Sequence, residues 1–264
     1  MASLVVLTLN IWNRQGPYAE RETRLRRGLA DLAADVVGLQ EVVADRATGR
    51  SQADELGEDL YPHRVFGMAR PIDEHRAYGN ALLSRFPVAD HQVVALPCLG
   101  VDEPRSVLVA RLETPAGILP VLVTHYSYRL DHGFVREQQS LAIARLLDGV
   151  GGDLPPLLLG DLNAAPDTTE IRFLRGAHAL EGRSVYLADS FGLVGEGPGY
   201  TFDGRHNGFA APWREPPRRI DYIFAGPPDA KGRLEPLESE VVLTKADEGI
   251  HASDHFGVLT RFQL

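Results

Sequence analysis

The segment from Leu157 to Asn163, with the sequence LLLGDLN, constrains the fold of this chain more than any other segment. A short run of leucines predicts a buried strand, and the glycine and the two polar residues that follow indicate where it ends. Because side chains alternate along a strand, we expect Asp161 and Asn163 to leave the sheet on one side, while Leu162 turns back toward the core. A carboxylate beside a carboxamide can hold a hard cation or a water molecule. The same pattern is also typical of an Asx turn that closes a strand.

Other short apolar runs predict further strands, and two segments with helical spacing of leucines predict helices. We expect strands at 4–9, 36–39, 79–84, 93–96, 106–113, 118–124, 219–224, 239–243 and 256–262. Helices are expected at 20–34 and 136–147, and a further one in the second half of the segment 44–59. The arginines of the first helix, among them Arg21, are interpreted as a solvated face. The order strand, helix, strand at the start predicts a crossover unit that brings two strand ends to one sheet edge.

Polar residues follow many of these predicted strands. They are Asn10, Glu41, His125, Asp161 with Asn163, Asp221, and Asp254 with His255. Each of them alone is more often a helix cap, a turn residue or a buried polar group whose hydrogen bonds are made within the core. Ligands in layered α/β folds nevertheless collect where strand ends meet, so their shared placement predicts one functional site.

Composition narrows the class of protein. A length of 264 residues fits one α/β domain, and we expect residues 1–264 to form a single unit. The formal net charge of −9 argues against a broad basic surface for nucleic acid, although a local basic groove remains compatible with it. Cys98 is the only cysteine, so a disulfide within the chain and a zinc site built from cysteines are both excluded. We read no leader sequence or membrane span, and we expect a cytoplasmic location.

The order of these motifs resembles that of the endonuclease/exonuclease/phosphatase superfamily, which includes deoxyribonuclease I and the neutral sphingomyelinases. The motifs are Asn10, Gln40-Glu41, Gly79-Asn80, Thr124-His125, Gly160-Asp161-Leu162-Asn163, Arg219-Ile220-Asp221-Tyr222-Ile223 and Ser253-Asp254-His255. They run from the first predicted strand to the last. The resemblance implies a four-layered α/β/β/α sandwich with two mixed sheets face to face and the site at one end.

The resemblance also implies a magnesium or manganese site. Glu41 resembles the principal metal carboxylate of the family, with Asn10 beside it, and Asp254 is expected to complete the metal sphere. Oxygen ligands of this kind suit Mg²⁺, which keeps several waters and shares its coordination sphere with substrate phosphate.

Five further residues resemble the catalytic group of the family. Asp161 corresponds to the residue that orients or deprotonates the attacking water, and Asn163 to one that contacts the phosphate. His255 corresponds to the histidine at the scissile phosphate, and Asp221 to the carboxylate that fixes its tautomer. His125 would donate to a non-bridging oxygen or assist the leaving group.

Four residues are expected to bind substrate. Asn80 belongs to the motif set, and Arg105 begins a strand, where a surface ion pair is an equally good interpretation. Tyr200 and Asn207 lie in the glycine- and proline-rich segment 195–217, which we interpret as a long functional loop.

The function predicted from all this is hydrolysis of a phosphate ester with Mg²⁺ or Mn²⁺, most simply of a phosphodiester. Trp12 stands where abasic-site endonucleases often carry a carboxylate, so that branch is disfavoured. A phosphomonoesterase of the same fold and a non-catalytic binding module are the alternatives. Nucleic acid is a possible but not a favoured partner, and the sequence leaves the oligomeric state open.

Overall fold

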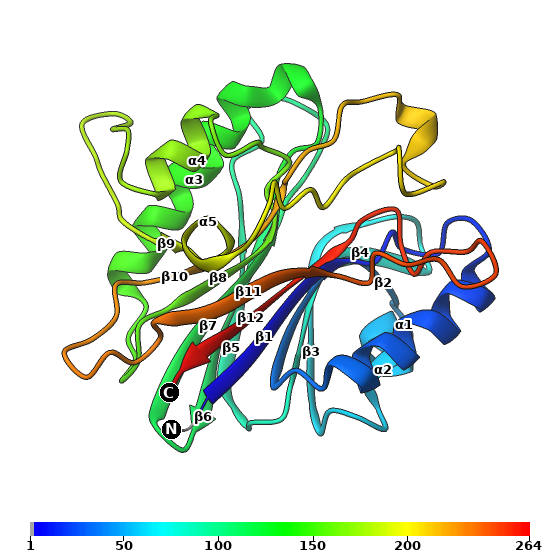
Figure 1. The fold of residues 1–264 in the computed structure, drawn as a ribbon, viewed down its shortest axis with the longest axis horizontal. Coiled ribbons are helices and arrows are strands. Elements are labelled where there is room, and N and C mark those ends of the chain that lie inside the picture. The colour runs from blue at the N-terminus through cyan, green and yellow to red at the C-terminus, as the bar shows by residue number, and fades with distance from the viewer. Residues whose placement is uncertain (1–2) are drawn as a thin grey trace.

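The computed structural model describes residues 3–264 and arranges them mainly as two six-stranded β-sheets packed face to face (Figure 1). The first sheet contains, in order, β11 (Pro236–Val242), β12 (Gly257–Gln263), β1 (Ser3–Asn10), β2 (Val36–Asp45), β4 (Arg76–Ser84) and β3 (His63–Pro71). The second contains β5 (Val88–Ala95), β6 (Ser106–Thr114), β7 (Gly117–His125), β8 (Leu157–Asp161), β10 (Asp221–Ala225) and β9 (Ala188–Asp189). Both sheets are mixed, as predicted.

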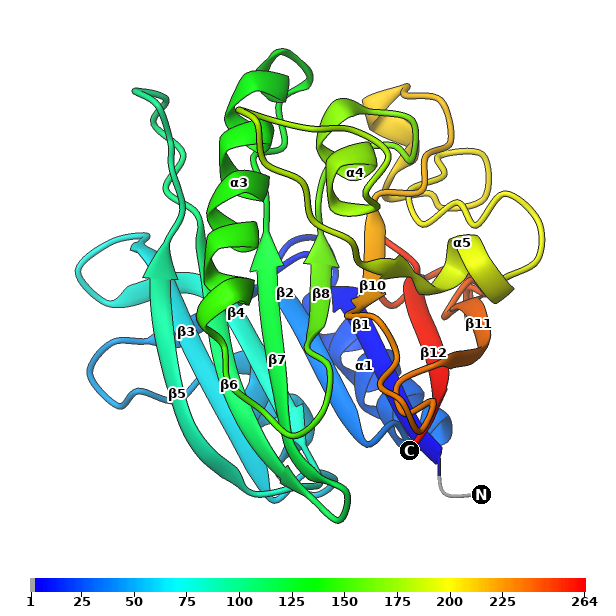
Figure 2. The same ribbon diagram turned by 90° about the vertical axis from the view of Figure 1, so that its left-hand side faces the viewer.

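Helices cover the outer face of each sheet, which completes the four layers. The outer leucines of β1 and β2 pack with those of α1 (Tyr18–Leu32) and with α2 (Gln52–Gly57). On the other side, α3 (Gly133–Gly149) and α4 (Thr169–Leu174) lie over the second sheet (Figure 2). A short helix, α5 (Ser190–Val194), packs beside β11. Two 3-10 turns complete the structure, η1 (Leu130–His132) and η2 (Ala211–Trp213). None of the helices among the described residues has the length and apolarity needed to cross a membrane.

The core between the sheets is tightly packed at Gly38 of β2. A Cβ atom at this position would lie 3.0 Å from Cδ1 of Leu159 in β8 and 3.2 Å from Cγ1 of Val123 in β7. Real Cβ atoms seldom have such close neighbours, so the absence of a side chain here lets the two sheets approach each other.

The parallel strand pairs fix where the polar strand ends meet. β1 pairs with β2, and β7 pairs with β8, so that Asn10 lies beside Gln40 and His125 lies beside Asp161. Gly160 belongs to this arrangement, because a Cβ there would lie 2.2 Å from the backbone oxygen of Thr124. The glycine of the LLLGDLN segment is therefore required by the close approach of β7.

The sequence missed several short or exposed elements. β3 is an edge strand whose residues are mostly half-buried, so it shows neither an apolar run nor a clean alternation. α4 and α5 are too short for a helical period to stand out. β2 extends to Asp45, beyond the predicted strand at 36–39. The prediction stopped early because a β-bulge between Leu39 and Val42 interrupts the apolar pattern of the strand.

Candidate active site

The polar strand ends meet in a cleft of about 740 Å³. Its lining includes Glu41, Arg105, His125, Asp161, Asn163, Asp254 and His255. A larger groove, of about 1060 Å³, lies between the segment 196–206 and the strands β11 and β12. None of the residues predicted to bind metal or to act in catalysis lines that groove. Ionisable groups with convergent geometry identify the smaller cleft as the candidate active site.

The β-bulge in β2 directs Glu41 toward the cleft. In a regular strand, Glu41 would share the outer face with Val37 and Leu39, which pack under α1. Glu41 instead has a left-handed backbone conformation, with φ of 61°. A residue other than glycine in this conformation is strained, and such strain is often found at functional sites.

Two asparagines hold the carboxylate of Glu41. Nδ2 of Asn13 donates to Oε2 of Glu41 at 2.7 Å, and Nδ2 of Asn10 lies 3.3 Å from Oε1. The same nitrogen of Asn10 donates to Oδ2 of Asp161 at 3.0 Å, while Oδ1 of Asn10 accepts from the backbone N–H of Trp12. Asn10 thus bridges the carboxylates of the two sheets. Its oxygen has a second lone pair besides the one that accepts from Trp12, so it keeps the capacity to bind a metal.

Asp254 supplies a second carboxylate near Glu41. Burial raises the pKa of Asp254 to about 7; His255 opposes this shift, and the negative charge of Glu41 adds to it. Two carboxylates that repel each other in this way favour a cation or a proton between them. Hard oxygen donors of this kind fit Mg²⁺ or Mn²⁺.

Asp161 lies between two histidines. Oδ2 of Asp161 is 3.3 Å from Nε2 of His125 and 3.7 Å from Nε2 of His255, and Asn10 also donates to it. Burial alone would raise the pKa of Asp161, but the two histidines and the hydrogen bonds outweigh it, so the pKa is lowered. Asp161 is therefore held as an anion.

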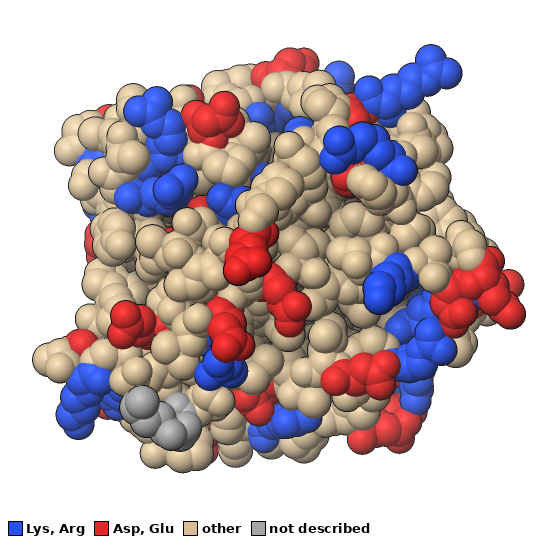
Figure 3. Space-filling view, in the orientation of Figure 1, with Lys and Arg blue, Asp and Glu red and all other residues tan. Residues whose placement is uncertain are grey.

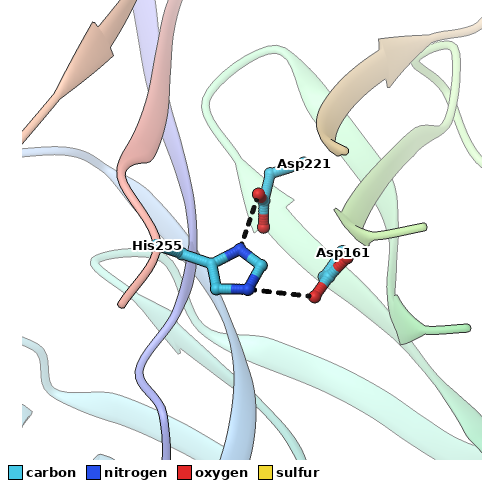
Figure 4. A group of neighbouring side chains, drawn as sticks. All are labelled: Asp161, Asp221 and His255. Atoms are coloured by element: carbon cyan, nitrogen blue, oxygen red, sulfur yellow. Dashed lines mark hydrogen bonds and ion pairs between the residues drawn. The ribbon is translucent and has the colours of Figure 1, made fainter. Parts of the chain in front are cut away.

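The ring of His255 connects Asp161 to Asp221 (Figure 4). Nδ1 of His255 lies 2.9 Å from Oδ2 of Asp221, which is fully buried. Burial would lower the pKa of His255, but the charges of Asp221 and Asp161 raise it well above its ordinary value. Burial also raises the pKa of Asp221. The proton that the pair shares resides on the imidazole, because the ring faces a second carboxylate, Asp161.

Asp161, Asp221 and His255 also form a group whose ligand atoms lie within 4.8 Å of one another. Such a group has the composition of a metal site. Both nitrogens of His255 already face carboxylates here, so the imidazolium supplies the positive charge that a metal would bring. Glu41 and Asp254 are the better candidates for the metal, because the hydrogen bonds of their carboxylates within residues 3–264 come from Asn10, Asn13 and Ser253 and none comes from a histidine.

Comparison with known proteins decides the family of the chain. The model of the Endonuclease/Exonuclease/phosphatase family matches residues 7–255. The chain belongs to this family. No curated protein matches the sequence.

Solved structures support the fold of this family member. An endonuclease/exonuclease/phosphatase from Beutenbergia cavernae DSM 12333 is 27% identical, with a TM-score of 0.75, over 99% of this chain and 72% of the other. One from Bacteroides vulgatus is 20% identical, with a TM-score of 0.78, and all of both chains is covered, 100% of each. TDP2 from D. rerio, complexed with single strand DNA product, is 18% identical, with a TM-score of 0.76, over 100% of each chain.

Asn163 fits both interpretations of the LLLGDLN segment, the turn that closes a strand and the polar residue of a site. Its backbone N–H donates to Oδ1 of Asp161 at 2.9 Å, and its φ is 49°, so an Asx turn does close the strand. The residue nevertheless lines the cleft, where Nδ2 donates to the backbone oxygen of Tyr126 at 3.2 Å.

The residues predicted to bind substrate are placed differently from those predicted to be catalytic. Arg105 lines the cleft, but its guanidinium is buried and bound to Glu103. Asn80 is not among the residues that line the cleft; its Nδ2 donates to the backbone oxygen of Ser106 and links the two sheets. Neither Tyr200 nor Asn207 lines the cleft.

Both of these loop residues have other partners. Tyr200 lines the larger groove, where its ring lies 5.5 Å from the guanidinium carbon of Arg205. Asn207 donates to the backbone oxygen of Ser253 and accepts from the N–H of Phe209. Asn207 therefore supports the segment that carries Asp254, and the prediction of direct contact with substrate has no support from its position.

The sequence interpretation was wrong about Arg21. Its side chain is fully buried, and its guanidinium donates to backbone oxygens of the segment 11–15 and of Ala252. It therefore ties the segment after β1 to the segment before His255. In the sequence, Arg21 is indistinguishable from its arginine neighbours, because the carbonyl groups that bind it come from distant segments. Tyr78, which contacts His125, was also missed.

Proposed function

We propose that this protein is a phosphodiesterase that depends on Mg²⁺ or Mn²⁺. The observation that carries the proposal is the convergence of Glu41 and Asp254 with an anionic Asp161 held between two histidines. This arrangement offers hard oxygen ligands on one side and a water-binding carboxylate with proton donors on the other.

Each residue has a defined part in this proposal. Asp161 orients the attacking water and accepts its proton, and Asn163 contacts the phosphate. His255, held by Asp221, donates to a phosphate oxygen and stabilises the negative charge that develops there. A metal ion bound by Glu41 and Asp254 would supply charge neutralisation at the phosphate.

The test is hydrolysis of bis-p-nitrophenyl phosphate and of p-nitrophenyl phosphate in Mg²⁺, in Mn²⁺ and in chelator. We expect the diester to be cleaved only with metal, and Glu41→Ala to lower the rate at least about 100-fold, because a main metal carboxylate is lost. Glu240→Ala is the matched control, since Glu240 is an exposed carboxylate of β11. Preference for the monoester would support a phosphatase instead. Folded protein that cleaves neither ester in the presence of metal would favour a binding module.

Aromatic side chains support a substrate with organic groups on both sides of the phosphate. Trp12, Phe202 and Trp213 line the cleft, and 55% of the surface of Trp213 is exposed. Aromatic rings of this kind stack on nucleobases. D. rerio TDP2 is described with a single strand DNA product, so short single-stranded DNA belongs in the substrate panel.

We expect Trp213→Ala to raise KM for an aromatic diester or a short oligonucleotide by roughly 5- to 150-fold, equivalent to about 1–3 kcal/mol of lost stacking. The value of kcat should change little, because Trp213 has no predicted part in the chemistry. Tyr186→Ala is the control, since Tyr186 is equally exposed but lies outside the cleft lining. Equal KM values for the two variants would contradict this assignment.

The charge distribution favours a small or single-stranded substrate over a long duplex. Figure 3 shows both signs of charge on one face of the molecule, with acidic side chains gathered over β11 and β12. Glu238 and Glu240 are exposed on β11. Such a face gives little attraction for a polyanion.

A further inference from the structure

A chain of hydrogen bonds ends at His125 in the wall of the cleft. Nη1 of Arg105 donates to the hydroxyl of Tyr78 at 3.3 Å, and this hydroxyl lies 3.2 Å from Nδ1 of His125. Nε2 of His125 lies 3.3 Å from Oδ2 of Asp161. All four side chains are buried. Tyr78 comes from β4 of the first sheet, His125 and Asp161 come from the second sheet, and Arg105 directly precedes β6.

The partners of the Tyr78 hydroxyl favour one direction for its bond to His125, because Nδ1 of His125 is the only acceptor that its proton has among residues 3–264. A guanidinium can only donate, so the hydroxyl oxygen of Tyr78 accepts from Arg105. The single proton of that hydroxyl is then available to Nδ1 of His125. A neutral imidazole that accepts at Nδ1 carries its own proton on Nε2. That proton points toward Asp161 and the cleft.

Burial, a contact with Arg70 and the fixing of Arg105 by Glu103 keep Tyr78 in this role. Burial raises the pKa of Tyr78 far above its ordinary value, so the hydroxyl keeps its proton wherever the protein is folded. The guanidinium carbon of Arg70 lies 4.9 Å from the centre of the tyrosine ring and packs against its face. Glu103 in turn fixes Arg105, with Nε donating to its Oε1 at 3.0 Å.

We propose that Tyr78 is a positioning residue that holds His125 as its Nε2–H tautomer, so that His125 serves the cleft as a hydrogen-bond donor and not as a base. In the free protein this proton faces Asp161. With substrate bound, it is available to a phosphate oxygen. The part of His125 in the reaction rests on the proposed phosphodiesterase function, whereas its tautomer does not.

The experiment compares the wild-type protein with Tyr78→Phe, which removes one oxygen atom and keeps the ring. Nitrogen NMR of the histidine side chains identifies the tautomer directly, at an alkaline pH where imidazole is neutral, and the spectrum of His125→Gln assigns the signal. Tyr61→Phe is the matched control. Tyr61 is also buried, but its hydroxyl has no hydrogen-bond partner among residues 3–264.

We expect wild-type His125 to carry its proton on Nε2 and Tyr78→Phe to show a mixture of both tautomers. With the diester, kcat of Tyr78→Phe should fall about 10- to 100-fold, as when other orienting partners of a catalytic group are removed, while KM stays near that of Tyr61→Phe. Protonation of wild-type His125 on Nδ1 would overturn the proposal. So would an unchanged tautomer in Tyr78→Phe. If the wild-type protein cleaves no ester, the phosphodiesterase function fails, and the NMR result still decides the tautomer.

Discussion

Asp161→Asn should lower kcat for the diester by about 10⁴-fold, the upper end of the range for loss of a general base. The side chain keeps its size, but its charge and its proton acceptor are lost. The carboxylate is also the common partner of His125 and His255, so both rings lose the anion that they face. Steady-state kinetics with saturating metal measure the effect.

Asp203→Asn is the matched control for this substitution. Asp203 is also buried, but it pairs with Arg205 and His206 beside the larger groove. Its variant should keep kcat within about threefold of the wild type. A thermal melt confirms that Asp161→Asn is folded, and a fall in kcat of less than tenfold would exclude Asp161 as the base.

Asp221→Asn should lower kcat by about 10³-fold and change the pH dependence of the reaction. The carboxylate of Asp221 is the largest of three charges, with those of Asp161 and Asp254, that raise the pKa of His255. In the proposed mechanism His255 is a protonated donor, so activity is expected below its pKa and should be lost as pH rises through it. Loss of Asp221 lowers that pKa, and the alkaline limb of the kcat profile should move to lower pH.

The free energy of unfolding should also depend on pH through the ion pair between His255 and Asp221. The pKa of His255 is raised in the folded state, so its contribution to the free energy of unfolding is fully present below the ordinary value of about 6.5. It is lost as pH rises from there through the raised pKa. Urea unfolding over this window should show falling stability in the wild type and a flatter dependence in Asp221→Asn. Identical slopes in the two proteins would contradict the ion pair.

The sequence allowed us to predict which strand ends carry the residues of the cleft, but not in which direction every side chain points. The apolar runs before Asn10, His125 and Asp161 locate strand ends, because hydrophobic period and strand length depend on local residues. The direction of Glu41 was not predictable in this way. It depends on a β-bulge, and the pairing of β2 with β4 that defines the bulge is a non-local property.

Residues that support the site from a distance were the hardest to predict. Asn80 was expected at the substrate, but its amide links the two sheets through the backbone of Ser106. Arg21 was expected in solvent, but it binds carbonyl groups of two segments that meet only in the folded chain. Their partners are backbone atoms, which leave no signal in the side-chain pattern of the sequence.

The contact at Gly38 makes the active site sensitive to events in the core. Glu41 belongs to one sheet and Asp161 to the other, so the spacing between the sheets also sets the spacing between a proposed metal ligand and the proposed base. A methyl group at Gly38 would press on Leu159 and Val123 and act as a wedge. Small displacements of reacting groups are costly to catalysis. A larger residue at Gly38 is therefore expected to impair the site from a distance, because Gly38 is not among the residues that line the cleft.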